Sequence, residues 1–190
     1  MSEPTTEPTT EPTTEPTDEA EAVPVPSWIL RPVRASDIEA IARAELELFP
    51  DEAWSRDQLI EELLHPLRRY VVCVEEGAGV GIPPGDELLG YAGIMVAGDS
   101  ADLHTIGTRR PGQGIGRALL RWCEQAARDL GARRLLLEVR EDNARARDFY
   151  TAAGYREIAH LRGYYRIRGR AVDALIMERQ LREAEGPAAS

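Results

Sequence analysis

A glycine-rich loop between an apolar segment and an amphipathic segment constrains this chain more than any other feature. The loop, residues 112–117, reads GQGIGR and follows a strand-like segment at 103–108. From Ile115 the apolar residues keep helical spacing as far as Gly131. Glycines between a strand and a helix let backbone N–H groups converge on an anion at the positive helix end. The loop therefore predicts a phosphate or pyrophosphate site, the alternative being a flexible turn.

Other classes of glycine-loop protein fit less well. All 23 basic residues are arginine, whereas a Walker-type phosphate loop and a Schiff-base mechanism both need lysine. A dinucleotide-binding loop, G-x-G-x-x-G, would be followed by an acid in the next strand, where Glu138 does stand. However, Arg117 occupies the place of the last glycine, and too few residues remain for a doubly wound sheet. All three alternatives are disfavoured.

Strand and helix patterns alternate from Trp28 onward. We expect strands over 29–33, 70–74, 88–96, 103–108, 135–139, 155–161 and 172–177, and helices over 36–50, 55–66, 115–130 and 143–153. A loop rich in glycine and proline separates two of the strands at 77–85. The apolar run at 135–139 is typical of a strand buried on both faces. The alternation indicates an α/β chain.

The first residues differ from the rest in composition. Glu-Pro-Thr-Thr repeats three times from Glu3, and the first 22 residues hold seven of the 33 acidic residues and no base. Such a segment cannot offset its ordering entropy by burial. We expect a disordered acidic tail at 1–26, one domain at 27–182 and a flexible end at 183–190. Most of the net charge of −10 belongs to the tail, and the absence of a basic excess argues against direct nucleic-acid binding.

Cysteine spacing and hydropathy bear on the compartment. Cys73 and Cys123 stand apart, without a C-x-x-C pair or a Cys/His cluster. This predicts two buried thiols and neither a disulfide framework nor a metal site. No apolar stretch approaches the ~20 residues of a membrane span, and the N-terminus lacks the basic and apolar regions of a secretory signal. We expect a cytoplasmic protein with no membrane partner.

Glu138 stands inside the apolar run LLLEVR at 135–140. A carboxylate in a buried strand is costly unless it is paired or used. Strand alternation places it on the same side as Leu136 and Arg140. One interpretation is a general base whose pKa is raised by partial burial. The other is a structural ion pair.

Tyr150 lies in the next predicted helix, on the face that also carries Ala146, Phe149 and Ala153. It is either a core aromatic with its hydroxyl at the rim or a phenol that donates a proton between strand and helix. His104 is a further candidate base, the alternative being a structural or substrate-lining role. By alternation it faces the same side as Ile106 and Thr108.

These residues together resemble the GNAT acetyltransferase superfamily over residues 29–181. The resemblance is carried by Thr105-Ile106-Gly107, by QGIGRALL at 113–120, by LEVR at 137–140, and by Asn143, Tyr150 and AGY at 153–155. GYY at 163–165 with DALIM at 173–177, and the pairs Phe49-Pro50 and Trp54-Ser55, are similar to the RimI branch, the ribosomal-protein-alanine N-acetyltransferases.

The resemblance implies a fold and a set of site residues. The fold is α/β (α+β): a mixed, mostly antiparallel sheet of roughly six to seven strands with about four helices, one parallel pair being splayed to admit acetyl-CoA. Glu138 would be the general base and Tyr150 the general acid. Acetyl-CoA would be held by Ile106, Gly107, Thr108, Gly112, Gln113, Gly114, Ile115, Gly116, Arg117 and Asn143.

The resemblance also implies a reaction. Acetyl would pass directly from acetyl-CoA to a protein N-terminal α-amine, with the alanine of a small-subunit ribosomal protein as first choice, without a metal and in a monomer or weak dimer. The alternatives are a GNAT enzyme that acetylates a small-molecule amine and a non-catalytic acyl-CoA-binding module. One departure concerns the loop, which is shorter than usual and has Pro111 where the family has Gln or Arg. Arg109 and Arg110 are candidates to supply the missing charge.

Overall fold

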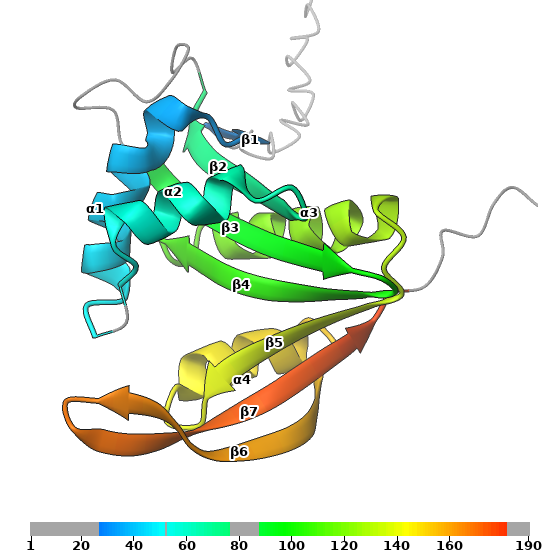
Figure 1. Cartoon of the computed structure of the whole chain (residues 1–190). Coiled ribbons are helices and arrows are strands. Elements are labelled where there is room, and N and C mark those ends of the chain that lie inside the picture. Colours follow the sequence, from blue (N-terminus) through cyan, green and yellow to red (C-terminus); the bar gives the residue numbers. More distant parts are fainter. Residues whose placement is uncertain (1–26, 52, 77–87, 182–190) are drawn as a thin grey trace, which may run out of the picture.

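Seven strands form one sheet in the part of the chain that the computed structural model describes, residues 27–51, 53–76 and 88–181. The strands are β1 (Trp28–Pro32), β2 (Arg68–Glu75), β3 (Leu88–Ala97), β4 (Ser100–Thr108), β5 (Arg134–Arg140), β6 (Arg156–Ile167) and β7 (Arg170–Gln180). The helices are α1 (Ile38–Leu48), preceded by the 3-10 turn η1 (Ala35–Asp37), α2 (Arg56–Leu64), α3 (Ile115–Asp129) and α4 (Ala144–Ala152) (Figure 1).

The sheet has the order β1-β2-β3-β4-β5-β7-β6, and only the pair β4–β5 is parallel among these strands. A parallel pair needs a crossover connection, which the glycine loop and α3 supply. β4 and β5 meet at one end and diverge toward the other (Figure 1). The predicted mixed sheet with a splayed parallel pair is therefore confirmed.

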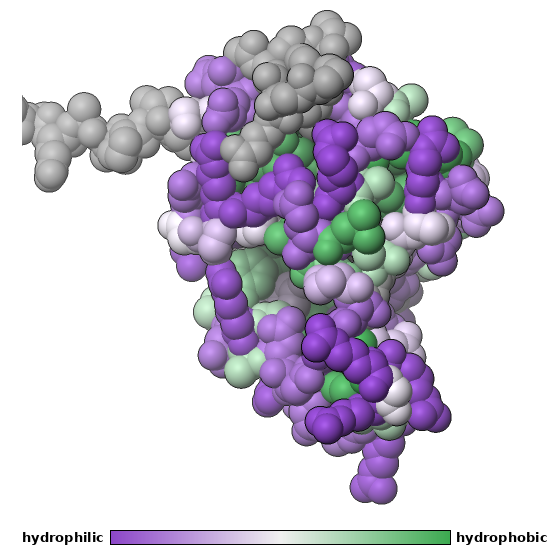
Figure 2. Space-filling view, turned by 90° about the vertical axis from the view of Figure 1, so that its left-hand side faces the viewer, coloured by the Kyte–Doolittle hydropathy of each residue, from purple (hydrophilic) through white to green (hydrophobic). Residues whose placement is uncertain are grey.

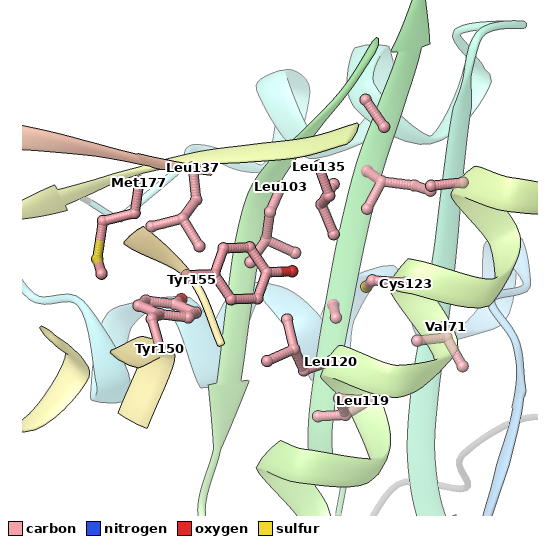
Figure 3. Close-up of a cluster of buried hydrophobic side chains, with 14 of the residues drawn as sticks. Val71, Leu103, Leu119, Leu120, Cys123, Leu135, Leu137, Tyr150, Tyr155 and Met177 are labelled. Carbon is pink, nitrogen blue, oxygen red and sulfur yellow. The ribbon is translucent and has the colours of Figure 1, made fainter. Parts of the chain in front are cut away.

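Helices cover both faces of the sheet. α1 and α2 pack on one face around Ile41, Leu59 and Tyr91. α3 and α4 contribute to the larger core on the other face, where Leu119, Leu120 and Cys123 of α3 lie opposite Leu103 and Leu135 (Figure 3). The apolar residues of α3 recur every three or four positions, so burial of one helical stripe accounts for this arrangement.

Local signals determine where several helices begin and end. Ser55 caps α2 by accepting a hydrogen bond from the Gln58 N–H, and the Gln58 side chain accepts one from the Ser55 N–H. The predicted glycine ends are also present, because Gly131 and Gly154 have φ of 89° and 88° after α3 and α4. Such positive φ values favour glycine.

Two predictions about the strands are wrong. β5 is not buried on both faces, because Leu135, Leu137 and Val139 are buried while Glu138 between them is exposed. β6 and β7 are 12 and 11 residues long, well beyond the predicted segments, because the polar outer face of this hairpin gave no hydrophobic signal. The predictions for 1–26, for the loop at 77–85 and for 183–190 concern residues outside those described.

The two cysteines are buried and free, as predicted. Burial raises the pKa of the Cys73 thiol to about 12, and burial raises that of Cys123 as well, with the nearby Glu124 adding to the shift. Neither thiol lines a cavity described below. Within the described residues, no helix is both long and apolar enough to cross a membrane.

Candidate functional site

The site forms where β4 and β5 separate. Their parallel pairing covers three residue pairs, from Ser100–Arg134 to Asp102–Leu136. Just beyond, the register between β3 and β4 shifts, leaving His104 as an extra residue in β4. Such a bulge bends and twists a strand, so β4 turns away from β5 at this point. Past Asp102, β4 has no strand pairing on the side that faces β5 in the described structure.

A cavity of about 480 Å³ occupies the opening. We call it the acceptor cavity, after the role proposed for it under Proposed function. The side chains that line it come from α1 and the segment after it, from the diverging halves of β4 and β5, from α4 and from Tyr165 of β6. Figure 2 views the molecule from the side toward which the strands diverge and shows apolar surface among hydrophilic side chains between its upper and lower parts.

A second cavity of about 270 Å³ lies on the glycine-loop side and includes Gly107, Thr108, Pro111, Gly116 and Phe149 in its wall. It is called the cofactor cavity, again after its proposed role. The two cavities share the six lining residues Leu48, Phe49, Ile106, Asn143, Ala146 and Tyr150. They are therefore neighbouring compartments that meet at the gap between β4 and β5.

Backbone geometry suits the glycine loop to an anion. Gly112 and Gly114 have φ of 86° and 77°, and Gly114 forms the N-cap of α3 without a side-chain capping bond. The first N–H groups of a helix lack intrahelical acceptors and carry partial positive charge. The loop therefore presents backbone N–H donors beside the cofactor cavity, and the phosphate site stays a prediction.

The predicted loop residues lie in different environments. Gly116 lines the cofactor cavity, and Gly112, Gln113, Gly114 and Arg117 are exposed. Ile115 is fully buried in the core, so its side chain anchors α3 and only its backbone can serve a ligand.

The arginines before the loop are engaged elsewhere. Arg109 Nε lies 2.9 Å from Glu47 Oε2, and Arg110 Nη2 lies 3.0 Å from Glu75 Oε1. These ion pairs hold both side chains against α1 and β2. The structure instead places Arg145, which the sequence reasoning missed, in the wall of the cofactor cavity.

The segment Ile106–Gly107–Thr108 borders the gap between β4 and β5. All three residues line the cofactor cavity. A side chain at 107 would bring its Cβ within 2.8 Å of Leu48 Cδ1, so glycine allows α1 to approach β4 here. The free edge of β4 offers backbone groups to an extended ligand in the manner of an added strand.

Glu138 lines the acceptor cavity from β5, on the side shared with Leu136 and Arg140 as predicted. The side chain is exposed, so the predicted partial burial of Glu138 is wrong. It makes no ion pair with another described residue, and its charge raises the pKa of the Tyr164 hydroxyl. The structural ion-pair interpretation is therefore also unsupported.

Tyr150 lies at the junction and lines both cavities. Its ring packs edge-on against Phe149 and Tyr155, with centroids 5.2 and 5.7 Å away, and Figure 3 shows it beside Tyr155 in the core. Burial raises the pKa of its hydroxyl, and Cys123 and Tyr165 add to the shift. The phenol therefore stays protonated at neutral pH. Its hydroxyl has no hydrogen-bond partner among the described residues.

Asn143 lines both cavities at the N-terminus of α4. Its Oδ1 accepts a hydrogen bond from the Ala146 N–H at 3.1 Å, so the side chain caps the helix. The amide nitrogen makes no hydrogen bond to a described residue and can serve as a donor to a ligand.

His104 lines the acceptor cavity but is held by a neighbour. Its Nδ1 lies 3.1 Å from Glu62 Oε2, and the Tyr70 hydroxyl donates to the same oxygen. The expected alternation fails at the bulge, because Leu103, His104, Thr105 and Ile106 all line the cavity. The structure thus supports a lining role for His104.

Glu45 is a site residue that the sequence reasoning missed. It is only 2% exposed, yet it lines the acceptor cavity from α1. Its Oε1 accepts hydrogen bonds from the Tyr91 and Thr105 hydroxyls, and its Oε2 accepts one from the Trp54 N–H. Helical spacing could have indicated its burial, because Glu45 follows the buried Ile41 by four positions and lies on the same face of α1.

Glu141, His160 and Asp173 form the one group with metal-ligand spacing among the described residues. Ion pairing explains the cluster, because His160 Nε2 lies 3.0 Å from Asp173 Oδ2. Asp173 Oδ1 also accepts the Gly163 N–H at 2.7 Å. Glu141 and His160 are exposed, and none of the three lines either cavity.

Known proteins resemble this chain in sequence. Residues 37–155 match the model of the acetyltransferase (GNAT) family. A Bacillus subtilis (strain 168) protein, named as a candidate [ribosomal protein bS18]-alanine N-acetyltransferase, is 32% identical over 151 residues, covering 78% of this chain and 92% of that protein.

Solved structures resemble it in fold. The ribosomal-protein-S18-alanine N-acetyltransferase of Escherichia coli superposes with a TM-score of 0.71 at 24% identity, covering 86% of this chain and 99% of that one. Arabidopsis thaliana NAA60, solved with acetyl-CoA, has a TM-score of 0.72 at 19% identity, covering 81% and 98%.

Proposed function

Because the chain belongs to the GNAT acetyltransferase family, we propose that it transfers acetyl from acetyl-CoA to a protein N-terminal α-amine, that of an alanine-starting small-subunit ribosomal protein. The observation that carries this proposal is the junction of two cavities in the gap between β4 and β5, with Tyr150 in both walls. The name of the 32% identical relative supports the choice of acceptor.

Acetyl-CoA fits the cofactor cavity chemically. The pyrophosphate would bind the N–H groups at Gly112 to Arg117. The pantetheine would pair with the free edge of β4 at residues 106–108 and with the Asn143 amide. Its thioester would then lie at the gap near Tyr150.

The amine would approach from the acceptor cavity. An N-terminal amine has a pKa near 8, against about 10.4 for lysine, so a modest base suffices to produce the neutral nucleophile. Glu138 would take the proton, directly or through water, as a carboxylate open to solvent can. The C–N bond forms, the C–S bond breaks, and Tyr150 gives its proton to the leaving thiolate. Each proton transfer contributes about 10²- to 10⁴-fold.

Direct attack is supported by the positions of the cysteines. Both thiols are buried and lie outside the walls of the two cavities. An acyl-enzyme would need a nucleophile at the junction, and neither Cys73 nor Cys123 can reach it.

We also propose the setting in which the enzyme acts. It would work in the cytoplasm as a monomer or weak dimer, without a metal, a membrane or direct nucleic-acid contact. The acetyltransferase domain would span 27–182.

A panel of acceptors tests the proposal. We expect an alanine-starting ribosomal peptide to be acetylated with a higher kcat/KM than polyamines or aminoglycosides. A preference for the small amines would replace the proposed function with the first alternative. Calorimetric binding of acetyl-CoA without turnover of any acceptor would favour a non-catalytic module.

A further inference from the structure

The acceptor cavity is lined by more carboxylates than cationic side chains. Its wall holds four carboxylates, those of Glu45, Asp51, Glu138 and Asp142, and the guanidinium of Arg140. Asp51 pairs with Arg168, and Asp142 pairs with Arg140. Glu45 and Glu138 have no cationic partner among the described residues. The described residues of the cavity wall therefore carry more negative than positive charge.

Glu45 differs from Glu138 in its burial. An exposed carboxylate is stabilised by water, whereas a buried one needs a counter-charge or a proton. The donors around Glu45 are neutral: the Tyr91 hydroxyl at 2.7 Å, the Thr105 hydroxyl at 3.4 Å and the Trp54 N–H at 3.4 Å. Burial raises the pKa of the Glu45 carboxyl, and these hydrogen bonds offset only part of that effect.

Tyr91 and Thr105 hold the Glu45 carboxylate in place. Tyr91 is fully buried in β3 and anchors Oε1 from beneath α1. Thr105 is also a cavity residue, so the carboxylate lies beside the β4 segment that borders the gap. Both oxygens of Glu45 accept hydrogen bonds, as those of an ionised carboxylate do. A carboxylate with no cation beside it, in the wall of the cavity proposed to receive the amine, is complementary to an ammonium group.

We propose that Glu45 binds the positively charged amino group of the acceptor and so selects acceptors that carry an ammonium group over neutral analogues. Glu45 is thus a specificity-determining residue, distinct from the proposed base Glu138. The inference rests on the proposed function and deepens it, because the cation that Glu45 receives is the α-ammonium of the N-terminus. Deprotonation follows as the amine moves toward the thioester.

The experiment compares two peptides in calorimetric titrations of the CoA-loaded full-length enzyme. One starts with alanine, and the other is its des-amino analogue, in which hydrogen replaces the α-amino group. Because hydrogen bonds to charged groups contribute about 1.5–3 kcal/mol, we expect the native enzyme to bind the amino peptide roughly tenfold or more tightly. We expect Glu45→Gln, which keeps the size and acceptor oxygen of the side chain, to reduce this ratio to near one.

The matched control is Glu39→Gln, which makes the same charge change on α1 at an exposed residue paired with Arg56. We expect it to retain the native ratio. Glu45→Asp, which keeps the charge, should retain part of the preference, and it provides a test if the glutamine variant fails to fold. Thermal unfolding of each variant verifies the fold.

Several results would overturn the inference. A folded Glu45→Gln with the native ratio would show that Glu45 only orders the loop after α1. Equal binding of the two peptides by the native enzyme, including no measurable binding of either, would also overturn it. Failure of the proposed function is separately visible, because a peptide that binds with the ammonium preference but is never acetylated leaves the role of Glu45 intact.

Discussion

Arg168 Nε lies 3.0 Å from Asp51 Oδ1, joining the turn between β6 and β7 to the segment after α1. Asp51 lines the acceptor cavity, as does Tyr165 of the same hairpin. Arg168 has a φ of 48°, which is uncommon outside glycine. The ion pair therefore connects two walls of the acceptor cavity that are far apart in sequence.

Breaking this pair should affect the acceptor more than the fold. The Arg168 side chain is 78% exposed, and exposed pairs contribute about 0–1 kcal/mol. We expect Arg168→Ala to raise the peptide KM about three- to fivefold with little change in Tm or in the KM for acetyl-CoA. Arg56→Ala, which breaks an exposed pair outside the cavity, is the control. An unchanged peptide KM would exclude a role for the pair in shaping the cavity.

Removing the proposed base should slow the chemical step. We expect Glu138→Gln to lower kcat by about 10²- to 10⁴-fold with a smaller effect on either KM, measured by thiol release. Tm should hardly change, because the side chain is exposed and has no ion pair among the described residues. Glu157→Gln, an exposed change on β6 outside both cavities, should leave kcat as it is. Native turnover in Glu138→Gln would assign the proton transfer elsewhere.

Tyr150→Phe should separate the hydroxyl from the ring. The ring packs in the core and stays, whereas the hydroxyl has no partner among the described residues, so we expect native stability and a kcat lowered about 10²-fold or more. We expect Tyr155→Phe to lower the stability and to leave kcat unchanged. The Tyr155 hydroxyl donates to the buried Glu124 at 3.3 Å and lies outside both cavities. Because the pKa of Tyr150 is raised, the native enzyme should show no alkaline loss of activity from this group near neutral pH. Full activity of Tyr150→Phe would remove it from the mechanism.

The glycine loop should be sensitive to a single methyl group. Gly114 has a φ of 77° and nothing within 4 Å of an added Cβ, so Gly114→Ala meets backbone strain of about 1–2 kcal/mol without a clash. We expect the KM for acetyl-CoA to rise several-fold as the loop relaxes. Gly98→Ala is matched in φ, 64°, and in free space, but it lies between β3 and β4. We expect Gly98→Ala to lower Tm about as much as Gly114→Ala does but to leave the KM for acetyl-CoA unchanged. Equal effects of the two substitutions on that KM would count against a phosphate-binding loop.

Much of the fold was predictable, because hydrophobic periodicity and helix-end signals depend only on residues close together in the chain. Ser55, Gly131 and Gly154 mark helix ends through capping and positive φ. The burial of Tyr150 also followed from its helix face. By contrast, one face of β5 is open at Glu138 because α1 and α2 pack chiefly on β2, β3 and β4, and the pattern of a single strand contains no information about which helix covers it.

The missed site residues depend on tertiary geometry. Glu45 is buried because α1 packs over Tyr91 of β3, and Asp51 reaches the cavity because the segment after α1 meets the β6–β7 turn. The bulge at His104 overrides strand alternation and turns consecutive side chains into the cavity. Such contacts join residues far apart in the chain, so spacing alone could not indicate them.

The position of the transferred acetyl group tests the central claim most directly. The native enzyme is incubated with acetyl-CoA and a peptide that carries an N-terminal alanine and an internal lysine, and the product is fragmented in a mass spectrometer. We predict one acetyl group, on the α-amino nitrogen, in the native enzyme and a strongly reduced yield in Glu138→Gln. Acetyl on the lysine side chain, or an unmodified peptide beside acetylated polyamine in the same tube, would contradict it.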